Sequence, residues 1–403
     1  MNVTNSKAHD LIAMEQQYGA HNYAPLDLVV ERAEGVWLYD VEGKRYLDCI
    51  SAYSAVNQGH AHPKIQDALI DQAKRVSLVS RAMRNARLPG LLQKLTALCG
   101  FDVALPMNTG AEAVETAIKL ARRYAYDIKG VAHNQAEIIV FNNNFHGRTT
   151  SIISASSDAA YKRSFGPFTP GFVLVEYGNS QALAAAINQN TAAILIEPIQ
   201  GEGGVNVPPE GFLKQAWALC KEHAVLFIAD EIQTGLGRTG TMFAVDHDGI
   251  TPDVLIVGKA LGGGYYPVSA ALARKELMDL FQPGDHGSTF GGNPLACAVA
   301  EAALDVIINE KLSDNARKMG DLLMNGLRAI KSPFIKEVRG RGLLVGIEFT
   351  RPAKSMSKAL LERGVAAKDT HANVLRLAPP LVITAPEIQH LLEQFESALN
   401  SLD

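Results

Sequence analysis

Four short, unbroken apolar runs constrain the fold of this chain more than any other feature of its sequence. They occupy residues 138–141, 192–196, 225–229 and 254–257. Apolar runs of this length are typical of strands that are buried on both faces, as in a parallel sheet. A helical pattern at residues 211–223 lies between two of the runs. We therefore predict an α/β fold with a mostly parallel central sheet flanked by helices.

The two ends of the 403-residue chain have a different pattern, and the chain is too long for one small domain. Residues 36–47 predict a hairpin that turns at Glu42-Gly43. Helical spacing from about residue 295 to 328 precedes a strand at 343–347, a helix at 356–363 and a closing helix from Pro386. We predict an N-terminal segment (1–53) that packs with the small domain, a large domain (54–300) and a C-terminal small α+β domain (301–403).

The charge balance excludes partners that bind through a broad electrostatic field. The chain has 38 basic and 42 acidic residues and a net charge of −4, which offers no general attraction for nucleic acid or an anionic membrane. Cys49, Cys99, Cys220 and Cys297 form no CxxC pair and no metal-like cluster, as expected for reduced thiols. We see neither a targeting pattern nor a membrane-spanning stretch, so we expect a soluble, cytoplasmic protein without a metal site.

A lysine at the end of a predicted buried strand is the strongest candidate for chemistry. Lys259 follows the run 254–257 and leads into the glycines of residues 262–264. At the carboxyl edge of a parallel sheet, its amine would point into the ligand crevice. Such a lysine can form a Schiff base with an aldehyde cofactor when burial or a neighbouring cation lowers its pKa. An isolated lysine in this position would more simply be a surface residue.

An aspartate ends the neighbouring predicted strand. Asp230 closes the run 225–229, about one βαβ unit before Lys259, so the two side chains can enter the same crevice. Pyridoxal 5'-phosphate (PLP) chemistry needs such a carboxylate, which keeps the pyridine nitrogen protonated so that the ring can accept electrons. The alternative is that Asp230 caps a helix. Taken alone, Asp230 fits a helix cap and a cofactor ligand equally well, and the presence of Lys259 favours the cofactor ligand.

Two glycine-containing segments could hold a phosphate. Thr109 and Gly110 precede a helical pattern at 112–123, and the exposed N–H groups and dipole of a helix start favour an anion. Many helices begin in this way, so the pattern is weak when taken alone. The second segment, residues 287–294, combines the hydroxyls of Ser288 and Thr289 with glycines and otherwise is typical of a loop.

Two arginines lie where a carboxylate could bind. In residues 144–149, Phe145 could stack on a flat ring and Arg148 could clamp a carboxylate. His146, between them, is more simply a polar loop residue, and we assign it no acid–base role. Arg376 lies inside an apolar run at 374–380. A buried arginine must be paired, so this position implies either a salt bridge or a substrate carboxylate.

Together these residues resemble the class III aminotransferases of PLP fold type I, over nearly the whole chain from about Tyr18 to Val382. The motifs at 230–235 (DEIQTG) and 258–260 (GKA) are highly specific to that class. Within it, the segments 18–23, 53–60 and 376–380 are similar to those of ornithine aminotransferases. His146 departs from the animal members, which have a tryptophan there. The lack of a visible mitochondrial presequence also differs from the animal enzymes and fits a bacterial type.

The resemblance implies a role for each residue around the cofactor. Lys259 would hold PLP as a Schiff base and then move the proton between substrate carbon and cofactor, and Asp230 would pair with the pyridine nitrogen. The other implied contacts are Phe145 and Ile232 on the two faces of the ring, Gln233 on its phenolic oxygen, Gly110 and Ala111 on the phosphate, and Ser288 and Thr289 on the phosphate of the neighbouring subunit's cofactor. The last contact implies an obligate homodimer with active sites shared across the interface.

The resemblance also implies the substrates. Tyr23 and Arg148 would bind the α-carboxylate of L-ornithine, and Tyr53 would lie near its α-amino group. Arg376 would bind the α-carboxylate of 2-oxoglutarate, and Glu202 would pair with Arg376 while ornithine is bound. The implied ping-pong reaction transfers the δ-amino group of ornithine to 2-oxoglutarate. Its products are glutamate and glutamate 5-semialdehyde, which cyclises to pyrroline-5-carboxylate.

Other interpretations stay open at this point. The nearest is another aminotransferase of the class, acting on N-acetylornithine or 4-aminobutyrate. The second is a PLP-dependent aminomutase, which needs no 2-oxoglutarate, and the third is a PLP-binding protein without catalysis. Glu202 on its own is a plausible exposed loop carboxylate, and a functional role for it is favoured only when it is considered together with Arg376. The sequence does not separate a role in proline biosynthesis from one in arginine catabolism.

Overall fold

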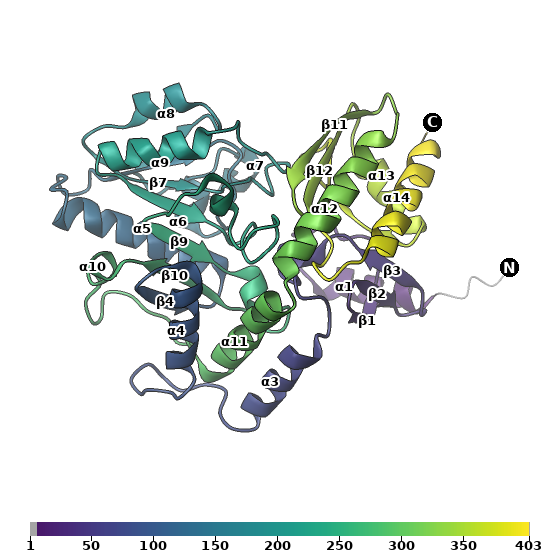
Figure 1. The fold of residues 1–403 in the computed structure, drawn as a ribbon, viewed down its shortest axis with the longest axis horizontal. Helices are drawn as coiled ribbons and strands as arrows, with labels where there is room; N and C mark the ends of the chain where they lie inside the picture. Colours follow the sequence, from purple (N-terminus) through teal and green to yellow (C-terminus); the bar gives the residue numbers. More distant parts are fainter. Residues whose placement is uncertain (1–5, 403) are drawn as a thin grey trace.

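A computed structural model describes residues 6–402; residues 1–5 of the predicted N-terminal segment and residue 403 of the predicted C-terminal domain lie outside the described residues. The described residues form three sheets, and a larger α/β body lies beside a smaller part that contains the first and the last described residues (Figure 1). Within residues 6–402, no helix combines the length and the apolar character needed to cross a bilayer.

The largest sheet has seven strands in the order β4-β10-β9-β8-β7-β5-β6. Their bounds are β4 Val103–Met107, β5 Glu137–Phe141, β6 Phe172–Val175, β7 Thr191–Ile196, β8 Leu226–Asp230, β9 Val254–Val257 and β10 Ser269–Ala273. The five strands from β9 to β6 run parallel, and β10 is antiparallel to both of its neighbours. The four strands predicted from apolar runs are β5, β7, β8 and β9, so the predicted mostly parallel sheet is confirmed.

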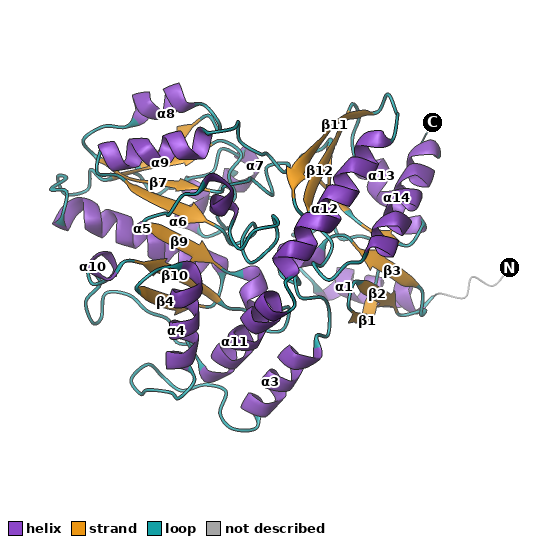
Figure 2. Cartoon of the chain, viewed as in Figure 1, coloured by secondary structure: helices purple, strands orange, loops and turns teal. Residues whose placement is uncertain are grey.

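Helices cover both faces of this sheet (Figure 2). The helices of the larger body are α3 Pro63–Ala73, α4 Leu88–Cys99, α5 Gly110–Asp127, α6 Thr150–Ser154, α7 Ala159–Lys162, α8 Ser180–Ala186, α9 Phe212–Glu222, α10 Lys275–Met278 and α11 Pro294–Asn309. On β5, Ile138 and Val140 pack in one core with α5, whereas Ile139 and Phe141 pack in another with Phe212 of α9. Successive strand residues point to opposite faces, so burial on both sides explains the unbroken apolar runs.

The smaller part contains two four-stranded sheets, β11-β12-β15-β14 and β1-β2-β3-β13. The strands are β1 Val30–Glu34, β2 Trp37–Asp40, β3 Arg45–Asp48, β11 Ile335–Arg341, β12 Leu344–Phe349, β13 Val365–Ala366, β14 Lys368–Thr370 and β15 Val374–Leu377; the helices are α1 Lys7–Tyr18, α2 Ser51–Ser54, α12 Leu312–Ala329, α13 Lys354–Glu362 and α14 Ala385–Asn400. The predicted hairpin is β2 and β3, and the predicted closing helix is α14. β13 pairs with β3, so the N-terminal segment shares a sheet with the C-terminal region.

The continuous helix predicted from residue 295 to 328 is wrong in one detail. The structure has two helices there, α11 and α12, separated by Glu310 and Lys311. Lys311 has a φ of 53°, a left-handed conformation that cannot continue a right-handed helix. The helical spacing of apolar residues continues from α11 into α12, so the sequence pattern alone did not predict the break between them.

Candidate active site

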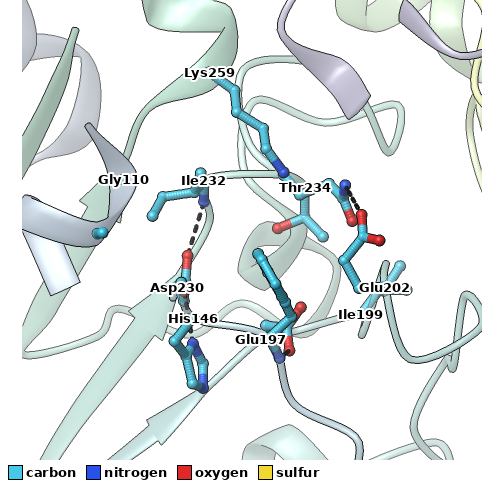
Figure 3. Close-up of a pocket in the computed structure, with 13 residues that line it drawn as sticks. Gly110, His146, Glu197, Ile199, Glu202, Asp230, Ile232, Thr234 and Lys259 are labelled. Atoms are coloured by element: carbon cyan, nitrogen blue, oxygen red, sulfur yellow. Dashed lines mark hydrogen bonds and ion pairs between the residues drawn. The ribbon is translucent and has the colours of Figure 1, made fainter. Parts of the chain in front are cut away.

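Three adjacent parallel strands end in the residues that form the floor of a pocket. Glu197 follows β7, Asp230 ends β8, and Lys259 begins the 3-10 helix η2 (Lys259–Gly262) just after β9. The carboxyl ends of parallel strands meet at one edge of the sheet, where ligands bind in open α/β folds. Figure 3 shows the three side chains in the same pocket. Of the predicted site residues, this pocket brings together Gly110, Ala111, Phe145, Glu202, Asp230, Ile232, Gln233 and Lys259.

Lys259 has the properties expected of a nucleophilic amine. It adopts a φ of 43°, which a non-glycine residue adopts only at a cost and which is found most often at functional positions. Burial lowers the pKa of its ammonium group, because a charge is poorly solvated inside protein. Within residues 6–402, its Nζ makes neither a hydrogen bond nor an ion pair, so the amine is available to a ligand in the pocket.

Asp230 is held by two neighbours, and one of them is His146, which is a buried partner of Asp230 and not the polar loop residue that the sequence suggested. Its Oδ1 accepts the N–H of Ile232 at 3.1 Å, and its Oδ2 accepts Nδ1–H of His146 at 2.7 Å. No helix begins at Asp230, so its alternative role as a helix cap is not observed. Burial by itself lowers the pKa of His146, but the hydrogen bond and charge of Asp230 outweigh it and raise the pKa. A histidine that stays protonated stabilises the Asp230 carboxylate.

Glu197 is a second residue that sequence reasoning missed. Its carboxyl is buried, and its Oε2 accepts the backbone N–H of Phe145 at 2.9 Å. Burial raises the pKa of Glu197 to about 7, although the charge of His146 opposes the shift. Glu197 directly follows a buried strand, as Asp230 ends one. The signal that located Asp230 could therefore have located Glu197 as well.

The start of α5 forms a cradle with free N–H groups. Thr109 caps the helix, with its side chain accepting from the N–H of Glu112 and the Glu112 carboxylate accepting from the N–H of Thr109. The preceding N–H groups, of Gly110 and Ala111, have no partner within residues 6–402. A Cβ on Gly110 would lie 2.9 Å from Cδ1 of Ile232, so a larger residue there would displace the Ile232 side chain from the pocket wall. Free N–H groups at a helix start bind phosphate.

Ser288 and Thr289 lie outside the pocket, in the loop before α11. Asn108 Nδ2 donates to Ser288 Oγ at 2.7 Å, which ties the loop to the residues before the α5 cradle. Thr289 is exposed. Phe290, next to it, is an exposed aromatic side chain. The structure thus places both hydroxyls near the edge of the phosphate cradle without making them part of the pocket wall.

Glu202 and Arg376 form a buried ion pair at the opposite end of the pocket. Arg376 Nη1 lies 2.7 Å from Glu202 Oε1, and the arginine is only 5% exposed. Burial would raise the pKa of Glu202, but the charge of Arg376 outweighs it and lowers the pKa. Gln233 Nε2 donates to Glu202 at 3.3 Å, and the Arg376 guanidinium lies 4.9 Å from the ring centre of Tyr53. The salt bridge that a buried Arg376 implied is therefore present.

Arg148 and the two predicted substrate tyrosines surround the mouth of the pocket. Within residues 6–402, Arg148 has no ion-pair partner; its guanidinium instead lies 4.1 Å from the ring centre of Tyr161 and 5.5 Å from that of Phe145. Tyr53 is 39% exposed and Tyr23 is 79% exposed. Tyr23 lines a separate groove formed with α1. The structure therefore brings Tyr53 to the Glu202–Arg376 pair but leaves Tyr23 on an open surface.

The residues present fit PLP. The free Lys259 amine matches its aldehyde, the Asp230 carboxylate matches its pyridine nitrogen, and the free N–H groups of α5 match its phosphate. Gln233 Oε1 and His146 Nε2 are buried without a hydrogen-bond partner in the described part of the chain. Such unsatisfied buried polar atoms are rare in a complete site, and both residues line this pocket.

Comparison with known proteins agrees with the geometry. A curated protein of Staphylococcus aureus named ornithine aminotransferase 2 is 57% identical over 389 residues, covering 96% of this chain and 98% of the relative. The solved structure of ornithine aminotransferase from Toxoplasma gondii has a TM-score of 0.97 at 43% identity, covering 99% of this chain and 95% of that chain. That of acetylornithine aminotransferase from Elizabethkingia anophelis has a TM-score of 0.89 at 49% identity, covering 98% and 100%. The family model of aminotransferase class III matches residues 18–399, and this chain therefore belongs to the class III aminotransferase family.

Proposed function

We propose that this chain is a PLP-dependent ornithine aminotransferase, which transfers the δ-amino group of L-ornithine to 2-oxoglutarate. The Glu202–Arg376 ion pair carries this proposal. 2-Oxoglutarate has a carboxylate next to its reacting carbon, whereas ornithine has none next to its δ-amine. An arginine with its own removable carboxylate partner can serve both substrates, because a buried arginine without any partner would be costly.

When bound, PLP supplies an electron sink for the substrate carbon. The Lys259 amine would accept the proton from the substrate carbon and return it to the cofactor. Asp230, hydrogen-bonded to His146 and to the N–H of Ile232, would face the pyridine nitrogen. The N–H groups of Gly110 and Ala111 would hold the phosphate, with Phe145 and Ile232 against the two ring faces. Gln233 would lie at the phenolic oxygen.

The remaining residues position the substrates. Arg148 and Tyr23 bind the α-carboxylate of ornithine, and Tyr53 lies beside its α-amino group. In this complex Glu202 keeps Arg376 paired, as the structure has it. In the other half-reaction, the α-carboxylate of 2-oxoglutarate takes the place of Glu202 on Arg376. The same mouth therefore accepts two substrates of different charge.

The comparisons support ornithine as the substrate. The S. aureus and T. gondii relatives have ornithine aminotransferase in their names, and the T. gondii structure has PLP at partial occupancy in its active site. The relative from E. anophelis is named for acetylornithine, so N-acetylornithine is the second candidate. The products, glutamate and glutamate 5-semialdehyde with its cyclised form, would feed proline biosynthesis or arise from arginine catabolism.

Single half-reactions test the substrate directly. The purified PLP-loaded protein is mixed with L-ornithine, N-acetylornithine or 4-aminobutyrate, without an oxoacid, and the loss of the cofactor's absorbance is followed. We expect ornithine to react with the highest kcat/KM and multiple turnovers to require 2-oxoglutarate. A faster reaction with N-acetylornithine would overturn the proposed substrate, and sustained turnover without an oxoacid would indicate an aminomutase.

We also propose a homodimer in which Ser288 and Thr289 reach the phosphate in the neighbouring subunit's site. Their loop is partly exposed and carries the exposed Phe290, as expected of a surface that another subunit covers. Mixing a Lys259→Ala chain with a Ser288→Ala/Thr289→Ala chain tests this sharing. Hybrid dimers would have one site with both changes and one with neither, so activity should recover. If each chain keeps its own loop at its own site, mixing recovers nothing.

We propose the same three-part organisation as the sequence indicated, with parts 1–53, 54–300 and 301–403. Its support is the sheet that β3 and β13 share. The helix α11 spans residue 300 and packs on α3 and α4, so it joins the second and third parts. We further propose a cytoplasmic location, in keeping with four cysteines that form no disulfide in the described residues. Limited proteolysis and cell fractionation test these two points.

A further inference from the structure

Tyr161, on the short helix α7, lies between two residues of the pocket mouth. The guanidinium of Arg148 lies 4.1 Å from the centre of the Tyr161 ring. The Tyr161 ring in turn meets the Phe145 ring edge-on, with centres 6.0 Å apart and an interplanar angle of 78°. Tyr161 thus connects the residue placed against the cofactor ring with the residue placed against the substrate carboxylate.

Arg148 contacts two aromatic rings at the mouth of the pocket. In the described residues it has no carboxylate partner, and its nearest attractive groups are the two aromatic rings. A ring attracts a guanidinium through its face. The N–H groups along the edge of the guanidinium then stay free to bind a carboxylate with two hydrogen bonds. A cation–π contact therefore holds the arginine without occupying the donors that a substrate needs.

The position of Tyr161 is itself set by the chain around it. Asp158 caps α7 by accepting the N–H of Ala160 at 2.8 Å. Just before this cap, Ser157 Oγ accepts the N–H of Asn143 at 2.8 Å, which ties the segment to the residues after β5. The ring is half-buried. α7 therefore presents Tyr161 from a segment that is anchored at the carboxyl edge of the central sheet.

The contact between Arg148 and Tyr161 joins a charged guanidinium to a neutral aromatic ring. Burial raises the pKa of the Tyr161 phenol. Arg148 opposes this shift through its charge and a side-chain hydrogen bond, while the charges of Asp158 and Glu202 add to it. The phenol stays protonated at neutral pH, so Tyr161 does not neutralise Arg148. The positive charge of Arg148 remains available to a bound anion.

We propose that Tyr161 is a positioning residue that orients Arg148 and thereby sets the preference for substrates with a carboxylate at the end remote from the transferred amine. This inference rests on the proposed function, in which Arg148 binds the α-carboxylate of ornithine. Tyr161 touches neither the cofactor nor the transferred amine in this scheme, and it acts only through Arg148.

The test compares L-ornithine with 1,4-diaminobutane, which is ornithine without its carboxylate. In Tyr161→Leu, the ratio of kcat/KM for ornithine to that for the diamine should fall roughly three- to tenfold, the range of a partly buried cation–π contact. The loss should appear in KM. Tyr161→Phe keeps the ring and should keep the ratio. Phe168→Leu is a matched control, because it removes a neighbouring cation–π contact with Lys162, at 4.8 Å, that does not involve Arg148.

Calorimetric binding of L-norvaline, which is ornithine without its δ-amine, gives the same comparison without turnover. Its dissociation constant should rise by the same factor in Tyr161→Leu and stay unchanged in Tyr161→Phe. An equal loss for ornithine and the diamine, or an unchanged ratio, would overturn the inference. If the wild type does not react with ornithine, the proposed function fails. The inference on Tyr161 is then tested with the substrate that the enzyme accepts, by comparing its kcat/KM with that of the same compound without its carboxylate.

Discussion

The floor of the pocket and its mouth are built in different ways. The floor residues Glu197, Asp230 and Lys259 lie at the ends of three strands that are adjacent in one sheet, and His146, the side-chain partner of Asp230, is buried. The mouth combines Tyr53 from the N-terminal segment with Arg376 from β15 of another sheet. The sheet therefore fixes the chemistry, whereas substrate choice depends on how separate segments pack against one another.

The two regions also differ in how they treat charge. In the floor, Asp230 and His146 form a pair that no substrate needs to open. In the mouth, Glu202 and Arg376 form a pair that, in the proposed scheme, 2-oxoglutarate opens and ornithine leaves closed. A permanent pair favours one rigid arrangement, and an exchangeable pair allows two. We expect changes in the floor to reduce catalysis or stability for every substrate, and changes in the mouth to separate the substrates from one another.

The largest effect is expected for Lys259→Ala. Without its amine, the proton transfer loses its general base, so kcat should fall by a factor of roughly 10³ or more for every substrate. The rate of each half-reaction is the measurement. Lys214→Ala, an exposed lysine on α9, should leave both rates unchanged. Full activity in Lys259→Ala would contradict the assignment of the floor as the catalytic region.

Glu197→Gln should change the pH dependence of stability. Burial raises the pKa of Glu197 from 4.5 to about 7, so the folded state keeps a proton that the unfolded chain releases above pH 4.5. The stability of the wild type therefore falls as the pH rises from 4.5 to 7, by up to about 3 kcal/mol from this group. Urea unfolding at pH 5 and pH 8 should show a smaller difference in Glu197→Gln. An identical difference in the two proteins would mean that Glu197 is not a buried acid.

Glu202→Gln should separate the two substrates. Arg376 would lack its charged partner while ornithine is bound, so kcat/KM for ornithine should fall roughly ten- to a hundredfold. 2-Oxoglutarate would no longer compete with a carboxylate for Arg376, and its KM should fall. Half-reaction kinetics with each substrate measure both values, with the exposed Glu210→Gln as control. If Glu202→Gln lowered kcat/KM equally for ornithine and 2-oxoglutarate, the claim that the mouth separates the two substrates would be wrong.

The smallest effect is expected for Tyr23→Phe. Tyr23 is 79% exposed, so water can replace its hydroxyl, and the KM for ornithine should rise only about two- to fivefold. Tyr18→Phe is the matched control, because Tyr18 is exposed to the same extent. If N-acetylornithine is the better substrate of the wild type and Tyr23→Phe does not affect ornithine, Tyr23 does not recognise a free α-amino acid.

Much of the floor could be predicted from the sequence because its signals are local. The apolar runs 225–229 and 254–257 predicted β8 and β9, and polar residues at their ends predicted the crevice. The same reasoning applied to Glu197 would have added it. β10 escaped prediction because it is rich in alanine, which has a weak preference for strands. His146 escaped because its partner, Asp230, lies 84 residues further along the chain.

The sequence by itself determined the layered α/β fold, the helix start that can hold a phosphate, and the positions of Lys259 and Asp230. Each of these follows from residues that are near one another in the chain. The family resemblance implied that Glu202 pairs with Arg376, 174 residues away, and the tertiary structure shows the contact. Only the tertiary structure decided that Tyr161 lies against Arg148. A charged or aromatic side chain can satisfy many partners, and the packing of distant segments selects among them.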